Sequence, residues 1–305
     1  MIKLILLSGF LGAGKTTLMT NILNSFADEK VGLIVNEFGE TGVDGPLLAK
    51  MGAQMTELNN GSIFCACIKD HFLRSLIDMS KQDISYLFIE PTGLADPSEM
   101  DKILETIQPM LGSGYDYRGV VCVVDAETFP KLSMVLPALT RQVEYAGAVI
   151  INKADLVDED RINNITKQIT ELNPYCEIIV TSHCQLDTRV LAMRLSPAKI
   201  APTDSTNTPE TRLYSTVLKP RGEVPVEPLR KFVEKLSVNA YRIKGFLPAK
   251  GGVIAVNAVG GVLNIDPWTK ENPPLGLVVI SAVGVSIISR ITEAMCNELK
   301  CSLSL

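Results

Sequence analysis

Two cysteines stand one residue apart in the segment LNNGSIFCACIKD, and a histidine follows closely. Cys65 and Cys67 offer thiolates and His71 offers an imidazole nitrogen, so the segment could ligate a soft or borderline metal ion. A closed structural zinc site needs about four ligands, usually from a second Cys/His pair, and the sequence has no such pair. Because free cysteine is also commonly buried, the alternative is that both residues pack a helix.

The stretch GFLGAGKT, residues 9–16, satisfies the pattern G-x-x-x-x-G-K-[ST] between an apolar run and a helical pattern. Its glycines allow backbone N–H groups and the helix N-terminus to face a phosphate. Lys15 is then predicted to reach the β- and γ-phosphates, Thr16 to bind Mg²⁺ and Thr17 to touch the α-phosphate. The alternative is a glycine-rich turn that matches by chance. Further phosphate contacts are predicted at Gly9, Gly12, Ala13 and Gly14.

The base of the nucleotide is indicated by NKAD, which follows the apolar run AGAVII. Guanine presents N1–H and its 2-amino group as adjacent donors that one carboxylate accepts, whereas adenine offers no such pair. Asp155 is therefore predicted to read guanine, with Lys153 along the base plane and Asn152 holding the loop together. Ser182, at the end of a later strand, is predicted near guanine O6. GTP is the predicted ligand, and the alternative is a solvated loop after a strand.

Glu90 ends another apolar run, YLFIE, and is predicted to hold Mg²⁺ through a water molecule. Gly93, three residues later, lets the following amide approach the γ-phosphate. The predicted catalytic residues are therefore Lys15, Thr16 and Glu90. For the neighbouring DPSE, residues 96–99, the alternative role is helix capping.

The motifs SGFLGAGKTT, VNEFGETGVDG, IEPTGLADP, VVDA and NKAD, in this order, resemble those of the CobW-type GTPases, relatives of the HypB and UreG metallochaperones. The resemblance covers nearly the whole chain. It implies a doubly wound, mostly parallel P-loop GTPase domain that binds GTP and Mg²⁺, and a smaller C-terminal α+β domain. It also implies a protein that often works as a dimer and assists insertion or handling of a metal or metal cofactor.

The cysteines depart from the family pattern, which is usually N-G-C-x-C-C. Aligning Asn60 and Gly61 places Ser62 and Phe64 at the first two cysteine positions, so that only Cys65 falls on a family cysteine. The two remaining thiols therefore have a different spacing, which strengthens the packing alternative.

The resemblance also implies a carboxylate ligand, Glu37, in the segment VNEFGE. Together with Cys65 and Cys67 it would give Zn²⁺ or Co²⁺ three ligands, with His71, water or a partner's residue in the fourth position. An open fourth position suits transfer of the metal better than storage.

The motifs and the family resemblance are compatible with two functions of different classes. The first is a GTP hydrolase acting on the β–γ phosphoanhydride, whose cycle drives delivery of a metal or metal cofactor. The second is a GTP-gated switch or chaperone that holds a corrinoid or other metalloprotein client without itself carrying metal. A third class, a partitioning ATPase of similar fold, is disfavoured by NKAD. No arginine or glutamine that accelerates hydrolysis is identifiable, so slow turnover is expected.

The composition argues against several other classes of protein. The chain has 305 residues, 46% hydrophobic and 21% charged, which is typical of a globular protein with one large and one smaller domain. A formal charge of −5 gives no electrostatic reason to bind nucleic acid or an anionic membrane. Seven cysteines without disulfide-like spacing fit a reducing, cytoplasmic location. The apolar run at 275–289 is shorter than the ~20 residues of a membrane-spanning helix.

The elements that must position these residues alternate between strands and helices, the pattern of a sheet covered on both faces. Right-handed crossovers then place the motif loops at one edge. We predict a GTPase domain at 1–195, a linker at 196–211 and a C-terminal domain at 212–305. The strands of the first domain are predicted near 2–8, 31–36, 84–90, 119–125, 147–152 and 176–181. In the C-terminal domain we predict a helix at 226–236, strands near 241–247, 252–257, 261–266 and 276–282, and a last helix through Leu299, with Trp268 packed in a turn.

Overall fold

The computed structural model divides into two compact units, Met1–Thr208 and Pro209–Leu305, each of which is considered by itself. At 54–57 and 66–69 the description covers the backbone alone. The predicted site residues Glu37, Cys65 and Gly93 lie outside the described residues. These are 1–35, 54–57, 66–91, 96–134, 136–198, 214–259, 262–269, 273–299 and 302–305.

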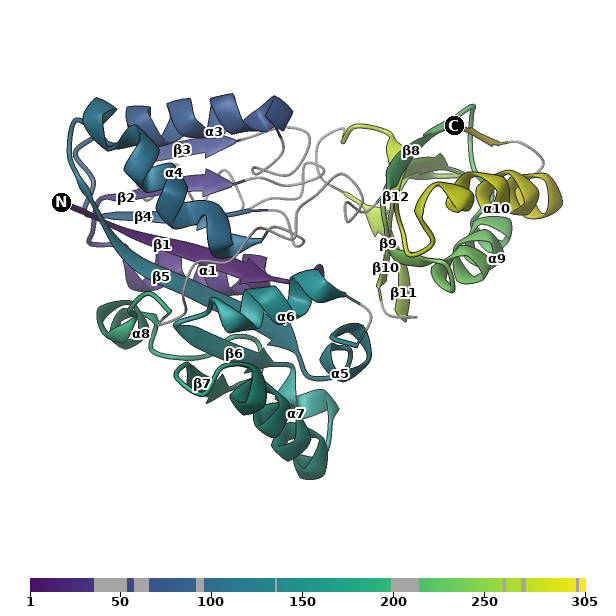
Figure 1. Cartoon of the computed structure of the whole chain (residues 1–305). Coiled ribbons are helices and arrows are strands. Elements are labelled where there is room, and N and C mark those ends of the chain that lie inside the picture. The colour runs from purple at the N-terminus through teal and green to yellow at the C-terminus, as the bar shows by residue number, and fades with distance from the viewer. Residues whose placement is uncertain are drawn as a thin grey trace. The chain divides into compact units, whose positions relative to one another are not determined.

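The first unit is built on a sheet whose seven described strands lie in the order β3-β2-β4-β1-β5-β6-β7 (Figure 1). Every described pairing in it is parallel, which confirms the predicted fold class. The sequence did not predict β3, because QMTE is not an apolar run. The strands are β1 (Ile2–Gly9), β2 (Val31–Val35), β3 (Gln54–Glu57), β4 (Tyr86–Glu90), β5 (Tyr115–Asp125), β6 (Ala148–Asn152) and β7 (Glu177–Val180).

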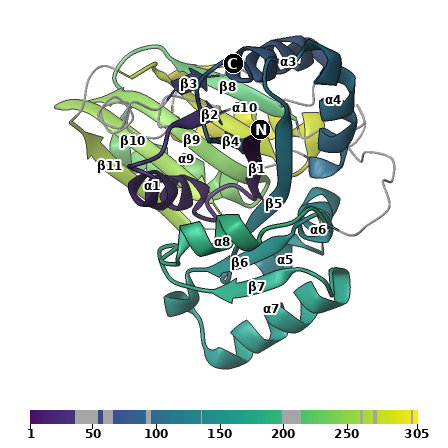
Figure 2. The same cartoon turned by 90° about the vertical axis from the view of Figure 1, so that its left-hand side faces the viewer.

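Helices cover both faces of this sheet (Figures 1 and 2). In β1, Ile5 and Leu7 pack in the cluster of α1 and α8, whereas Leu4 and Leu6 pack in the cluster of α3 and α4. This alternation is what a strand buried on both faces requires. The helices are α1 (Lys15–Ser25), α3 (Ala66–Met79), α4 (Met100–Ile107), α5 (Phe129–Leu132), α6 (Pro137–Glu144), α7 (Glu159–Leu172) and α8 (Thr188–Arg194), with short 3₁₀ turns η1 (Pro97–Glu99), η2 (Gln108–Met110) and η3 (Ala154–Leu156).

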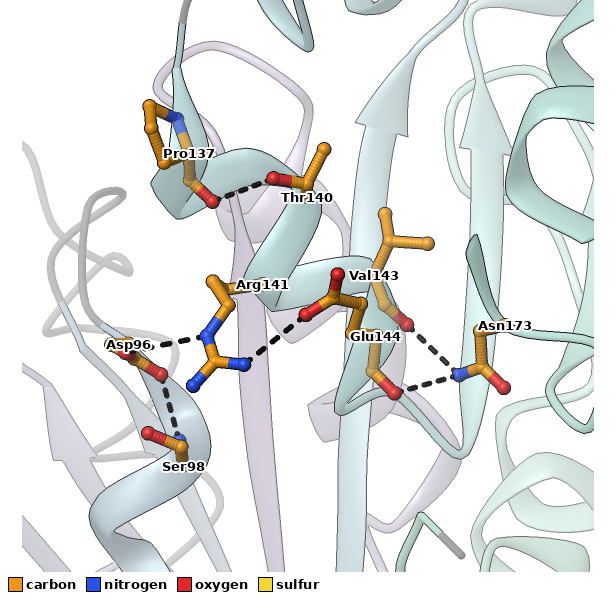
Figure 3. Close-up of polar contacts among 8 residues, drawn as sticks. All are labelled: Asp96, Ser98, Pro137, Thr140, Arg141, Val143, Glu144 and Asn173. Atoms are coloured by element: carbon orange, nitrogen blue, oxygen red, sulfur yellow. Dashed lines mark hydrogen bonds and ion pairs between the residues drawn. The ribbon is translucent and has the colours of Figure 1, made fainter. Parts of the chain in front are cut away.

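The C-terminal end of α6 is held by a side chain from the end of α7. Nδ2 of Asn173 lies 2.9 Å from the carbonyl oxygen of Val143 and 3.0 Å from that of Glu144 (Figure 3). It also lies 2.8 Å from the carbonyl oxygen of Ala146. Asn173 itself is 2% exposed. Because a helix leaves its last carbonyls without intrahelical donors, this one amide replaces the missing partners and fixes where α6 ends.

The second unit is an antiparallel sheet with helices packed on it, which confirms the predicted α+β domain. The described strands lie in the order β11-β10-β9-β12-β8-β13. The Trp268 ring packs 4.7 Å from that of Phe246, between centroids. None of the helices in the described parts of either unit is long and apolar enough to cross a bilayer. The elements are β8 (Ser215–Pro220), α9 (Val226–Ser237), β9 (Ala240–Ala249), β10 (Gly252–Val259), β11 (Val262–Trp268), β12 (Gly276–Ser281), η4 (Gly284–Ser286), α10 (Ile287–Ala294), a π-helical turn η5 (Met295–Leu299) and β13 (Leu303–Ser304).

We predict that Asn173→Ala destabilises the first unit. The substitution removes the Asn173 donor from the carbonyls of Glu144 and Ala146, whereas the Val143 carbonyl keeps the N–H of Ala146, and a buried unsatisfied polar group costs about 1–3 kcal/mol. The free energy of unfolding should therefore fall by about 2 kcal/mol in urea titrations followed by circular dichroism. The matched control is Asn164→Ala, an exposed position on α7, where alanine is the better helix former and no loss is expected. Equal unfolding curves for both variants would contradict the prediction.

Candidate functional site

The carboxyl ends of the parallel strands gather the described candidate residues at one edge of the first sheet. β1 ends at Gly9, β4 at Glu90, β5 at Asp125 and β6 at Asn152, while Ser182 follows β7 by two residues. The pairing register places Gly9 beside Val123 of β5, and Asp125 beside Asn152. In doubly wound sheets this edge is where ligands bind.

The phosphate loop has a positive φ at three glycines, Gly9, Gly12 and Gly14, and two of them also have no room for a Cβ atom. Gly9 and Gly14 have φ angles of 130° and 112°, in the left-handed region. A Cβ atom at Gly9 would lie 2.2 Å from the carbonyl oxygen of Val123, and one at Gly14 would lie 2.3 Å from Nδ2 of Asn152. The first and the last of these glycines are therefore required by both conformation and space.

The helix that follows this loop presents the predicted phosphate ligands in its first turn. Lys15 is 7% exposed, and its Nζ donates to the carbonyl oxygen of Phe10 at 3.2 Å. Thr16 is half-buried and Thr17 is exposed. The buried Glu90 ends β4, the strand directly beside β1. Hydroxyl and carboxylate oxygens are the ligands that Mg²⁺ prefers, so the donor set at this edge fits that ion.

The side-chain amide of Asn152 joins the phosphate loop to the loop after β7. Its Nδ2 donates to the carbonyl oxygen of Ala13 at 2.8 Å, and its Oδ1 accepts from the backbone N–H of Cys184 at 2.9 Å. The Cys184 thiol in turn donates to the carbonyl oxygen of Gly14 at 3.5 Å, and burial raises its pKa to about 12. From α1, Asn21 donates to the carbonyl oxygen of Cys184 at 2.8 Å. The two loops therefore form one hydrogen-bonded unit.

Lys153 is held by a carboxylate that was not among the predicted site residues. Its Nζ lies 2.5 Å from Oδ2 of Asp125, which is 7% exposed at the end of β5. The other oxygen, Oδ1, accepts from the N–H groups of Glu127 at 2.8 Å and Thr128 at 3.4 Å. Lys153 itself has a left-handed φ of 61°. The pair thus ties the loop after β6 to the neighbouring strand. The sequence signal was the VVDA motif, which ends β5.

Asp155 is exposed, and its neighbour Ser182 orients it. The Asp155 N–H donates to Oγ of Ser182 at 3.1 Å. Hydrogen bonds from the Ser182 side chain and from its own backbone lower the pKa of the Asp155 carboxyl, and the charges of His183 and Lys153 add to the effect. The carboxylate is therefore ionised and open to a ligand. The predicted position of Ser182 near guanine O6 stays a prediction, and its hydroxyl makes this further contact to Asp155.

The described part of the CAC segment forms the start of α3. Cys67 is the second residue of this helix, and His71 follows one turn later, exposed to solvent. Residues four apart in a helix share a face, so positions 67 and 71 lie on one face of α3. Glu37 and Cys65 lie outside the described residues. Within the described part of the chain, no group of three or more His, Cys, Asp or Glu side chains could hold a metal ion.

Comparison with known families assigns both units. Residues 3–180 match the sequence model of the family described as CobW/HypB/UreG, nucleotide-binding domain. The chain belongs to this family. Residues 213–294 match a second one, described as the cobalamin synthesis protein cobW C-terminal domain. The predicted resemblance is thereby confirmed, and the edge described above lies within a nucleotide-binding domain.

Individual proteins and a solved structure are also similar to this chain. The zinc chaperone YjiA of Escherichia coli (strain K12) is 33% identical over 197 residues, which cover 62% of this chain and 60% of that protein. The zinc-regulated GTPase metalloprotein activator 1 of Dictyostelium discoideum is 27% identical over 333 residues, covering 88% and 68%. A crystal structure of a zinc-bound triple mutant of the YjiA GTPase shares the fold, with a TM-score of 0.51, 23% identity and coverage of 98% and 99%. The chain spans 46% to 68% of the length of the curated relatives it matches.

We predict that Ser182→Ala raises the pKa of Asp155. The substitution removes the largest cause of the lowered value, so the carboxyl should take up its proton at a higher pH than in the unmodified protein. Carbon-detected NMR titration of the Asp155 side chain measures this. Ser182→Thr keeps the hydroxyl and should keep the lowered pKa. Identical titration curves for the alanine variant and the unmodified protein would show that Ser182 does not orient Asp155.

Proposed function

We propose that the protein binds GTP with Mg²⁺, hydrolyses the β–γ phosphoanhydride slowly, and uses this cycle to assist insertion or handling of a metal or metal cofactor. The observation that carries the proposal is the double hydrogen bond of Asn152, to Ala13 in the phosphate loop and to Cys184 in the loop after β7. These bonds support the proposal because they join the loop that we assign to the phosphates to the end of the strand before the loop that we assign to the base. Membership of a nucleotide-binding family supports it.

At the phosphate end, the proposal assigns the chemistry to Lys15, Thr16 and Glu90. The ammonium of Lys15, which Phe10 holds in the loop, turns to the β- and γ-phosphates when nucleotide enters. Thr16 and, through water, Glu90 would hold Mg²⁺, which when bound neutralises charge on the phosphates. Gly93 gives the amide that follows it room to approach the γ-phosphate. The backbone N–H groups of the loop and of the first turn of α1 complete the cradle.

At the base end, the proposal assigns guanine recognition to Asp155. Its ionised carboxylate accepts both the N1–H and the 2-amino hydrogen, and Ser182 keeps it in place. The methylenes of Lys153 lie along the base plane while its ammonium stays on Asp125. Asp125 is therefore part of the proposed guanine site, although it does not touch the base.

Turnover is proposed to be slow until a further group is supplied. In GTPases an arginine finger is worth ~10³ to 10⁵ in rate. A second copy of the chain or a metalloprotein client is the proposed source, so a homodimer belongs to this proposal. The spacing of the cysteines supports a reducing, cytoplasmic location.

The proposed cargo is Zn²⁺ or Co²⁺, bound by Cys65, Cys67 and Glu37 with His71 as a fourth ligand. The names of two relatives, a zinc chaperone and a zinc-regulated GTPase, support a zinc-related role. The alternative is a GTP-gated switch that binds a corrinoid or other metalloprotein client without carrying metal. The absence of two family cysteines from residues 62 and 64 favours this alternative.

The nucleotide assignment is tested with Asp155→Asn. The amide places a donor against a guanine donor, so GTP affinity should fall on the order of 100-fold in calorimetry. Xanthine carries a carbonyl where guanine has the 2-amino group, so xanthosine triphosphate should bind this variant better than GTP does. Equal affinity of the unmodified protein for ATP and GTP would contradict the assignment of Asp155 as the residue that recognises guanine.

Lys15→Ala serves as the control for the phosphate loop in the same experiment. It should lower phosphate release from GTP by about 100-fold or more, because it removes charge from the β- and γ-phosphates, while the preference for guanine remains. Hydrolysis that persists unchanged in this variant would contradict the proposed catalytic site.

The cargo is tested by titrating Co²⁺ into reduced protein, with and without a non-hydrolysable GTP analogue. Thiolate ligation gives a charge-transfer band, which we expect to depend on nucleotide and to vanish in Cys65→Ala/Cys67→Ala. Cys296→Ala, which removes an exposed cysteine of the second unit, is the matched control and should keep the band. The absence of a band favours the client-binding alternative, and a band that survives the double substitution shows that Cys65 and Cys67 are not the ligands.

A further inference from the structure

Two consecutive residues in the loop after β7 have a backbone conformation that their side chains disfavour. His183 has a φ of 54° and Cys184 a φ of 51°, and among the described residues the one other non-glycine with a positive φ is Lys153. In this left-handed region a Cβ atom crowds the backbone, so the conformation persists only where neighbouring groups hold it. The turn at His183 and Cys184 therefore depends on contacts from other segments.

Two asparagines from other elements bind the backbone of this turn. Nδ2 of Asn21, on α1, donates to the carbonyl oxygen of His183 at 3.2 Å and to that of Cys184 at 2.8 Å. A primary amide carries two N–H hydrogens, so one nitrogen can bind both carbonyls. Oδ1 of Asn152 accepts the backbone N–H of Cys184 at 2.9 Å. Asn152 thus holds the N–H side of the turn, and Asn21 holds both of its carbonyls.

The position of Asn21 on α1 explains how it reaches the turn. It lies seven residues after Gly14, about two helical turns, so the two positions share a face of the helix. The Cys184 thiol donates to the carbonyl oxygen of Gly14 at 3.5 Å. The helix that follows the loop, α8, packs in the same cluster as α1 (Figure 2), and Nε of Arg189 on α8 donates to the carbonyl oxygen of Ser25 at 2.7 Å. The loop after β7 and the helix that follows it are therefore attached to α1 along its length.

The turn is joined directly to the residue that orients the proposed base reader. Ser182 precedes His183 in the chain, and its Oγ accepts the N–H of Asp155 at 3.1 Å. The carbonyl oxygen of Thr181 accepts the N–H of Ala154 at 3.2 Å. A change in the turn therefore moves Ser182 and alters the support of Asp155.

We propose that Asn21 is a positioning residue for guanine recognition: by holding the carbonyls of His183 and Cys184, it keeps Ser182 against Asp155. This inference rests on the proposed function and adds a residue of α1 to the base side of the site. Because α1 begins at Lys15, the same helix then positions groups at both ends of the nucleotide. Asn21 touches no nucleotide atom in this role.

The test compares affinities for GDP and for inosine diphosphate, which lacks the 2-amino group of guanine. Asp155 accepts two hydrogens from guanine and one from hypoxanthine, so the ratio of the two affinities reports how well its carboxylate is placed. In calorimetry, Asn21→Ala should lower the affinity for GDP about tenfold and that for inosine diphosphate about threefold, so that the ratio falls about threefold. Asn21→Asp keeps the size of the side chain but presents oxygen to both carbonyls, and it should lower the ratio at least as much.

Two further variants separate positioning from general stability. Asn24→Ala removes an exposed asparagine one turn later on the same helix and should leave both affinities unchanged. Adding Ser182→Ala to Asn21→Ala should lower the ratio little further than the single substitutions do, because both act on Asp155 through one contact. A role of Asn21 in stability alone would lower the melting temperature and weaken both diphosphates by the same factor, which would overturn the inference.

NMR titration of Asp155 in the absence of nucleotide gives an independent readout. The hydrogen bond from Ser182 is the largest cause of the lowered pKa of this carboxyl, so its pKa should rise in Asn21→Ala as in Ser182→Ala. Asn24→Ala should keep the lowered pKa. A titration curve that Asn21→Ala leaves unchanged would show that Asn21 does not act on Asp155.

The proposed function fails separately from this inference. If the unmodified protein binds neither diphosphate, or binds both equally well, the assignment of Asp155 fails and the inference falls with it. If the unmodified protein prefers GDP and Asn21→Ala keeps the full preference, the role of Asn21 is rejected and the guanine site stands.

Discussion

The side-chain amide of Asn152 is the contact on which the geometry of the sheet edge depends. It is buried, it donates to Ala13 and it accepts from Cys184, so both of its functional atoms are satisfied. A primary amide carries a donor and an acceptor in one plane, which aspartate and leucine of similar size do not. The amide also packs against Gly14, where any Cβ atom would collide with it. The conformation of the phosphate loop therefore depends on asparagine at position 152, and the space for that asparagine depends on glycine at position 14.

The end of β6 distributes its contacts among three neighbours. Asn152 holds the loop that follows β1, Lys153 holds the end of β5, and Asp155 meets Ser182 after β7. Successive residues of an extended chain point in different directions, and the left-handed conformation of Lys153 turns the chain further at this point. Four consecutive residues can thus organise loops from both sides of the strand. So short a motif can therefore fix several loops at this edge of the sheet.

The sequence was most informative where a feature is local. The apolar runs of β1, β4 and β6, and the spacing of glycines and NKAD, lie within single segments and were recognised from them. The strand β3 was missed because QMTE becomes a strand only by pairing with β2, where Gly32 faces Gln54. β5 begins before its predicted start because its first residues, from Tyr115, are aromatic or charged and only half-buried.

The remaining site residues could not be found because their roles come from contacts between distant segments. The VVDA motif singled out the end of β5, but nothing in it indicates that Asp125 meets Lys153. Cys184 was visible only as part of VTSHC, and its bond to Gly14 requires the two loops to be assembled. Periodicity and motifs describe one segment at a time, whereas these pairs depend on the order of strands in the sheet.

That order also determines when the edge can form during synthesis. β1 is made first, yet its neighbours are β4 and β5, so Lys3 pairs with Tyr86 and Leu7 with Val121. A parallel strand cannot pair through a short hairpin, and at on the order of ten residues per second β1 waits roughly ten seconds for its first neighbour to leave the ribosome. In the second unit, β9 pairs with β10 and β10 pairs with β11, each of them the next strand in the chain. The phosphate loop is thus an early segment of the chain but a late element of the fold, and among the described strands β1, which precedes it, waits longest for a partner.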